Sequence, residues 1–196
     1  MIKRKETALR HIEQGLSKIH LWDKSLFEDE DLVVAEMNSD VLSYEYYYPG
    51  RPNDKLAYVP RELRTRRICE AAVRKDWRNL KYVPEEILDE ALLLDGIRQD
   101  PQALCLVQEK FRTEKACRES VKGNGTMLMC VPEPLRTEDM CKLAVKNAGI
   151  ALQDVPDDLR TLEMCGIAVK DNPIAIEFVP PEILTEAVVA LYESRR

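Results

Sequence analysis

The sequence has no long apolar run, no tract rich in serine and glycine, and no excess of positive charge. No stretch is long and apolar enough to span a membrane, so neither a secretory signal nor membrane insertion is expected. Seven glycines leave little material for a long flexible linker. The formal charge of −6 and the isoelectric point of about 5.2 argue against a general nucleic-acid binder, which is usually strongly basic.

The six cysteines contain no CxxC pair, so we expect free thiols in a reducing compartment. The only histidines are His11 and His20, which leaves little material for a thiol–imidazole pair. No catalytic residue, metal ligand or cofactor is predicted from these patterns.

A valine–proline pair recurs at intervals of 24 residues, and this spacing carries most of the information in the chain. The pairs begin at Val59, Val83, Val131, Val155 and Val179, and Val107-Gln108 fills the remaining position. A fixed period without slippage predicts one structural unit stacked on itself. The full units are 59–82, 83–106, 107–130, 131–154 and 155–178, and a capping helix follows from 179.

Each unit contains the signature of one long helix. One position in every unit holds a good helix N-cap residue, and these residues are Thr65, Asp89, Thr113, Thr137, Thr161 and Thr185. Apolar residues follow at helical spacing, for example Met140, Cys141, Ala144 and Val145, which predicts a helix near 137–147. The stretch around each valine–proline pair is too short for a second long helix and favours a short helix or 3₁₀ turn. The expected fold is therefore an all-α solenoid.

Residues 1–58 depart from the period and are expected to form an N-terminal helical cap on the array 59–196. Leu9, Ile12, Leu16 and Ile19 form one helical stripe, and residues 27–37 resemble a degenerate repeat helix that starts at Ser25 or Glu28. Residues 44–58 have the composition of a loop with aromatic content. Its tyrosines include Tyr44, Tyr46, Tyr47 and Tyr48.

Two consecutive units carry a family resemblance. Leu135-Arg136-Thr137…Cys141…Ala144-Val145…Leu152…Val155-Pro156 and Leu159-Arg160-Thr161…Cys165…Ala168-Val169…Ile176…Val179-Pro180 resemble bacterial repeat proteins of the DUF4116 type, a domain of unknown function. The resemblance covers roughly residues 59–196, and the period is also similar to that of leucine-rich-variant solenoids. It implies a bacterial cytoplasmic protein, or an effector acting in a host cytosol, and it supplies no catalytic residue.

One position near the end of each long helix is always basic. These residues are Arg74, Arg98, Lys122, Lys146 and Lys170, and a second, partial series is Arg64, Arg112, Arg136 and Arg160. Stacking predicts a row of cations on the solvent side, available to an acidic partner or to phosphates. Favourable interaction with the helix dipole, worth about 0.3–1 kcal/mol per cation, explains the same pattern without any ligand.

The sequence thus predicts a non-catalytic protein–protein interaction module or scaffold, such as a bacterial effector or regulatory adaptor. The cation row and the tyrosines of 44–58 are the candidate contacts, because tyrosine is enriched at binding hot spots. Nucleic acid or a phosphorylated ligand along the row is the first alternative. The second is a thiol enzyme, since Cys69, Cys117, Cys141 and Cys165 lie four residues after an N-cap, where thiols can be reactive. Burial as small core residues explains that column too, and the recurrence of cysteine in four units favours this interpretation. The partner's identity and the oligomeric state are not predicted.

Overall fold

The computed structural model describes residues 2–16, 19–39 and 54–193, and every regular element in these ranges is an α-helix or a 3₁₀-helix. Ile2 and Trp22 form an isolated parallel bridge. The expected all-α class is therefore confirmed. Contacts divide the chain into two units, residues 1–99 and 100–196, and each is described by itself.

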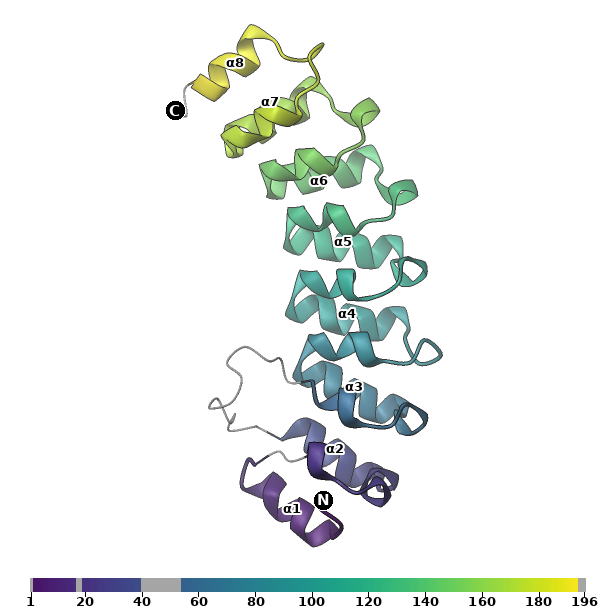
Figure 1. The fold of residues 1–196 in the computed structure, drawn as a ribbon. Helices are drawn as coiled ribbons and strands as arrows, with labels where there is room; N and C mark the ends of the chain where they lie inside the picture. Colours follow the sequence, from purple (N-terminus) through teal and green to yellow (C-terminus); the bar gives the residue numbers. More distant parts are fainter. Residues whose placement is uncertain (1, 17–18, 40–53, 194–196) are drawn as a thin grey trace. The chain divides into compact units, whose positions relative to one another are not determined.

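Unit 1 contains four α-helices with shorter 3₁₀-helices between them (Figure 1). Its elements are α1 (Lys5–Glu13), η1 (Ile19–Leu21), η2 (Lys24–Glu28), α2 (Glu30–Asn38), η3 (Lys55–Tyr58), η4 (Arg61–Leu63), α3 (Arg66–Lys75), η5 (Trp77–Tyr82) and α4 (Glu90–Gln99). Helix α2 contacts both α1 and α3, and α3 contacts α4, so successive helices are neighbours in space.

Unit 2 follows a stricter order, in which each α-helix contacts the next one along the chain (Figure 1). Its elements are η6 (Pro101–Leu106), η7 (Glu109–Phe111), α5 (Glu114–Gly123), η8 (Gly125–Cys130), η9 (Glu133–Leu135), α6 (Glu138–Asn147), η10 (Gly149–Asp154), η11 (Asp157–Leu159), α7 (Leu162–Asp171), η12 (Pro173–Phe178) and α8 (Glu186–Glu193). The longer 3₁₀-helices η6, η8, η10 and η12 also contact one another in sequence and form a second layer.

The predicted N-caps explain where the α-helices begin. The Oγ1 atoms of Thr65, Thr113, Thr137 and Thr161 each accept a hydrogen bond from the backbone N–H three residues later, at distances of 3.2–3.3 Å. Asp89 Oδ1 accepts the corresponding bond from Leu92 at 2.9 Å. Each cap satisfies one backbone donor that the first turn would otherwise leave unpaired.

The apolar stripe of each helix faces the interior of its unit. Met140, Cys141, Ala144 and Val145 of α6 are at most 1% exposed, as the spacing predicts. The leucine three residues before the repeated valine is also buried, for example Leu128 of η8 and Leu152 of η10. The core of each unit therefore lies between the α-helices and the longer 3₁₀-helices.

The segment between successive α-helices contains more structure than the single short element predicted. A six-residue 3₁₀-helix precedes the valine, as in η5, η6, η8, η10 and η12, and in several segments a three-residue 3₁₀-helix follows the proline. Short polar side chains start four of the longer 3₁₀-helices. Oδ1 of Asp76, Asp100, Asn124 and Asn172 accepts the N–H two residues later.

The N-terminal region differs from its prediction in two places. The stripe from Leu9 to Ile19 is not one helix, because α1 ends at Glu13 and Gly15 adopts a positive φ of 66°, which is typical of a helix end. Ile19 then lies in η1. Helix α2 begins at Glu30, not at Ser25 or Glu28, since Asp29 Oδ1 caps it through the N–H of Leu32.

The expected loop 44–58 ends in a helix. Residues 44–53 lie outside the described part of the chain, whereas Lys55–Tyr58 forms η3 with Leu56 fully buried. The Lys55 ammonium is also buried, and it donates to the backbone oxygens of Glu36 and Ser39 at the end of α2. These bonds attach η3 to α2. The division of the chain at residue 58 stays a prediction.

Candidate interaction surface

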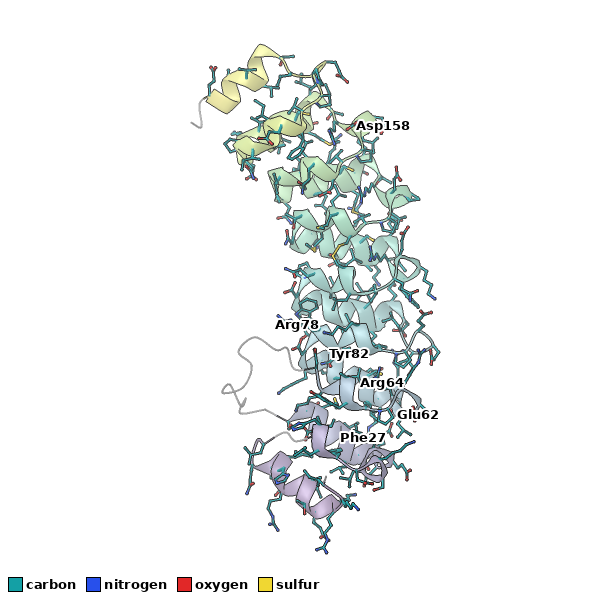
Figure 2. The ribbon with its side chains drawn as sticks, viewed as in Figure 1. Phe27, Glu62, Arg64, Arg78, Tyr82 and Asp158 are labelled. Carbon is teal, nitrogen blue, oxygen red and sulfur yellow. A yellow bond between two sulfur atoms is a disulfide. The ribbon has the colours of Figure 1, made fainter. Side chains whose placement is uncertain are left out.

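The arginines of the second basic series turn toward the backbone. Arg64 Nε donates to Val59 O at 2.9 Å, and its Nη1 donates to Tyr82 O at 2.6 Å (Figure 2). The same two bonds recur at Arg112, Arg136 and Arg160, always to the valine five residues earlier and to the residue eighteen positions later. Each half-buried guanidinium thus joins the end of one long 3₁₀-helix to the end of the next.

This arrangement removes these arginines from the predicted ligand-binding row. All three guanidinium nitrogens of Arg136 and of Arg160 donate to backbone carbonyls. A shallow depression of about 390 Å³ lies beside these two residues, and Asp154 and Asp157 also line it. Because the guanidiniums are already bonded and carboxylates share the depression, it is poorly suited to a phosphate.

The first basic series lies on the surface, in the last turn or at the end of each helix. In unit 1, Arg74 and Arg98 are exposed, and Arg98 forms an ion pair with Asp95 at 2.6 Å. In unit 2, Lys122, Lys146 and Lys170 are exposed at corresponding positions of α5, α6 and α7. Since α6 contacts both α5 and α7, the three ammonium groups occur at the same end of three neighbouring helices.

Two isoleucines accompany these lysines, and the sequence pattern did not single them out. Four residues after Lys146 and Lys170, in the first turn of η10 and η12, lie Ile150 and Ile174. Ile150 is partly exposed, and Ile174 is 58% exposed. The corresponding residues of the earlier segments are Arg78, Gln102 and Thr126, so the change from polar to apolar was visible in the sequence. We call Lys122, Lys146, Lys170, Ile150 and Ile174 the helix-end edge.

Hydrogen bonds between neighbouring helices fix the backbone under this edge. The side-chain amide of Asn147 donates to the backbone oxygens of Val121 and Lys122, both at 2.9 Å, and so caps the end of α5 from α6. The Oδ2 atom of Asp171 accepts the N–H of Gly149 at 2.7 Å. These bonds hold the helix ends in register, because each one joins adjacent 24-residue segments.

The opposite ends of the same helices are acidic. Glu138 and Asp139 occupy the first turn of α6, Glu163 that of α7, and Asp157 and Asp158 the short helix η11. Figure 2 labels Asp158 of η11. Carboxylates at helix starts and ammonium groups at helix ends both complement the helix dipole. Unit 2 therefore has an acidic edge and a basic edge.

The column cysteines are core residues, as the simpler interpretation expects. Cys69, Cys117, Cys141 and Cys165 are free and fully buried. Burial raises the pKa of Cys69, Cys117 and Cys141 to about 11, and it also raises that of Cys165. A raised pKa disfavours the thiolate, which is the reactive form, so this column offers no activated nucleophile.

The other two cysteines contradict the expectation that all six thiols are free. Cys105 of η6 and Cys130 of η8 form a disulfide, with their Cα atoms 5.5 Å apart. They lie 25 positions apart, one more than the repeat, which places them on adjacent segments. The lack of a CxxC pair did not exclude this bond, because the stacking of η6 on η8 brings distant cysteines together.

The tyrosine-rich segment contributes little that can be described. Tyr44, Tyr46, Tyr47 and Tyr48 lie outside the described residues. Tyr58, which follows them in η3, is 48% exposed, and its ring centroid lies 6.0 Å from that of His20. The binding role of the tyrosines stays a prediction.

The described ranges contain neither a cluster of potential metal ligands nor a helix that is long and apolar enough to cross a membrane. The fold and this surface define a class of all-α protein in which one α-helix and two kinds of 3₁₀-helix recur, with a basic edge on unit 2. Residues 137–184 match the family model described as Domain of unknown function (DUF4116). This match confirms the resemblance for α6, α7 and η12, over a shorter range than the 59–196 expected. No curated protein and no solved structure matches the chain.

Proposed function

We propose that this protein is a binding module that recognises a protein partner through the helix-end edge of unit 2. The observation that supports this proposal is the combination of three exposed lysines with the exposed Ile174 and the partly exposed Ile150 at the same end of neighbouring helices. Dipole complementarity accounts for the lysines alone, but it gives no reason to expose Ile174 beside Lys170. A contiguous apolar patch rimmed by charge is typical of a protein-binding surface, so the proposal requires Ile150 and Ile174 to be covered together by the partner.

The chemistry of the edge indicates the chemistry of the partner. Carboxylates would pair with Lys122, Lys146 and Lys170, and apolar side chains would cover Ile150 and Ile174. None of the three lysines forms an ion pair with another residue of the described chain, so their ammonium groups are available to a ligand. A segment that alternates acidic and apolar residues meets both requirements. The charge steers its approach, and burial of the apolar groups stabilises the complex.

A synthetic fluorescent peptide of alternating glutamate and leucine tests the proposal directly. Its binding to the full chain is measured by anisotropy over a range of salt concentrations. Reversal of the three lysines, in the variant Lys122→Glu/Lys146→Glu/Lys170→Glu, is expected to weaken binding at least about tenfold, or about 1.4 kcal/mol. The variant Ile150→Ser/Ile174→Ser is expected to weaken it similarly without changing its salt dependence.

The matched control reverses charges at the other ends of the same helices. Asp139→Lys/Glu163→Lys changes the net charge in the opposite direction at exposed positions away from the edge, and it should not weaken peptide binding. Equal affinity of the lysine-reversal variant and the unmodified chain would contradict the proposal.

In the alternative function, the same lysines bind nucleic acid. The salt dependence of the affinity distinguishes this binding from that of the peptide. Single-stranded DNA bound along the row would lose affinity steeply as salt rises, because each phosphate contact releases counterions. A peptide held partly by Ile150 and Ile174 would lose less. Stronger binding of DNA than of the peptide at physiological salt would favour the alternative.

The biological role and the cellular compartment are also part of this proposal. A role as a bacterial effector or regulatory adaptor, in a bacterial cytoplasm or a host cytosol, is supported only by the family resemblance. An α-solenoid that continues through all the 24-residue segments would suit a scaffold, because each segment of such an array contacts its neighbours and leaves extended surfaces open.

A further inference from the structure

An exposed leucine interrupts the carboxylates at the helix starts of unit 2. Leu162 is the first residue of α7 and is 54% exposed. Every other 24-residue segment has a charged residue at this position, namely Arg66, Glu90, Glu114, Glu138 and Glu186. The helix dipole gives no reason to place an apolar side chain there. This edge of unit 2 therefore combines charge with exposed apolar surface, as the helix-end edge does.

Three exposed carboxylates accompany Leu162. Glu163 follows it in α7, Asp158 lies in η11 just before α7, and Asp139 lies in the first turn of α6, which contacts α7 (Figure 1). Glu138 already forms an ion pair with Lys142, so it is not counted among the contact residues. From here on, the acidic edge means Asp139, Asp158, Leu162 and Glu163.

The acidic edge and the helix-end edge are complementary in charge and in spacing. Lys146 and Lys170 lie in the last turns of α6 and α7, and Asp139 and Glu163 lie in the first turns of the same two helices. Because both edges belong to the same neighbouring helices, their charges are spaced alike along unit 2. The lysines of one edge can therefore meet the carboxylates of the other, while the isoleucines cover Leu162.

A single chain does not pair its own two edges, because a helix of ten residues holds them about 15 Å apart. We infer that the partner of the helix-end edge is the acidic edge of a second copy of this chain. The ends of α6 and α7 in one copy then face the starts of α6 and α7 in the other, so the helix dipoles also align favourably. The inference rests on the proposed function, because it names the partner of the same surface.

This contact joins two different surfaces, so it does not close on itself. A copy that is bound through its helix-end edge still offers its acidic edge to a third copy. The assembly should therefore grow with protein concentration. Because exposed charges contribute to the contact, association should weaken as the salt concentration rises.

Sedimentation of the full chain tests the inference. Between about 5 and about 500 μM, where weak protein contacts form, the weight-average mass should rise from the 22.6 kDa of one chain to more than that of two chains. The glutamate–leucine peptide competes for the helix-end edge, so it should return the mass toward that of one chain. A mass that stays at one chain, or that levels off at two, would overturn the inference.

Charge reversal on each edge tests the pairing itself. The variant Lys122→Glu/Lys146→Glu/Lys170→Glu has negative charge on both edges, and Asp139→Lys/Glu163→Lys has positive charge on both. Each variant alone should associate at least about tenfold more weakly than the unmodified chain. An equimolar mixture brings opposite charges together again and should associate. Circular dichroism checks that both variants fold, and a mixture of folded variants that stays monomeric would refute the pairing.

The variant Leu162→Gln separates the inference from the proposed function. It removes an exposed apolar side chain without changing the charge, so it should weaken self-association about fivefold and leave peptide binding unchanged. Unchanged self-association of this variant would exclude Leu162 from the contact and overturn the inference. Peptide binding by a chain that does not self-associate would overturn the inference alone, whereas a chain that does not bind the peptide would contradict the proposed function.

Discussion

At the scale of single residues, the most informative side chains are the arginines that lie five residues after the repeated valine. Like the lysines near the helix ends, these arginines are positively charged and recur every 24 residues. The sequence pattern alone therefore predicts two rows of cations. The structure separates them, because all three guanidinium nitrogens of Arg136 donate to backbone carbonyls of two adjacent segments. Arginine suits this role since its planar fork presents several donors in fixed directions.

This role predicts that lysine cannot replace arginine here. Arg136→Lys keeps the charge but loses the fork that reaches three carbonyls, and it should lower the free energy of unfolding by about 1–3 kcal/mol. Urea unfolding measures the change. The control Arg118→Lys, at an exposed position of α5, should remain within about 0.5 kcal/mol of the unmodified chain. Equal stability of the two variants would show that the carbonyl bonds contribute nothing.

The buried thiols predict a loss of stability at alkaline pH. Burial raises the folded-state pKa of Cys141 to about 11 from an ordinary value of 9.0, so the folded protein retains a proton that the unfolded chain loses. Its contribution is fully present below pH 9 and is lost as pH rises toward 11. Unfolding followed by circular dichroism across this window should therefore show a shallower decline for Cys141→Ala than for the unmodified chain. Identical slopes would contradict the raised pKa.

At the scale of elements, the valine–proline period and the threonine caps predicted the α-helices well. The cap at Thr137 and the buried stripe from Met140 to Val145 follow from local rules of capping and periodicity, so both are visible in one segment of sequence. The long 3₁₀-helices were missed because their six residues are too few to show a period. Asn124 and Asn172 each follow the end of an α-helix, and the side chain of each accepts an N–H in the first turn of the next 3₁₀-helix.

Features that depend on neighbouring segments were not predictable in the same way. The Cys105–Cys130 bond and the Asn147 cap on α5 arise only when one segment packs on the next. Part of the edge could have been found from sequence, since Ile150 and Ile174 follow polar residues at the same position of the repeat. Which cations face solvent could not be predicted, because the carbonyls that bind Arg136 come partly from the next segment.

A close approach between η10 and α7 predicts a specific sensitivity at Gly149. A Cβ atom there would lie 2.5 Å from Ala168 O of α7, too close for any side chain without movement of the backbone. Gly149→Ala should destabilise the protein by about 1–3 kcal/mol, measured by urea unfolding. Gly166→Ala, inside α7, is the matched control and should stabilise by up to about 1 kcal/mol through helix propensity. Stabilisation by both variants would mean that η10 and α7 are not in contact.

At the scale of the molecule, the two units differ in how their helix starts are paired. In unit 1, ion pairs join α1 to α2, α2 to α3, and α3 to Asp89 before α4; their partners are Lys5–Asp29, Arg67–Asp31 and Arg66–Asp89. In unit 2 the pairs Lys142–Glu138 and Arg160–Asp157 each join two residues of one segment. The carboxylates at the starts of α6 and α7 lie at the opposite helix ends from Lys146 and Lys170, which is the property that the proposed binding requires.

The most direct test of that claim is a hydrogen-exchange footprint of the glutamate–leucine peptide on the full chain. The account predicts protection at the ends of α5, α6 and α7 and in the first turns of η10 and η12, with no protection in residues 1–99. Protection centred on the acidic helix starts, or on unit 1, would contradict it.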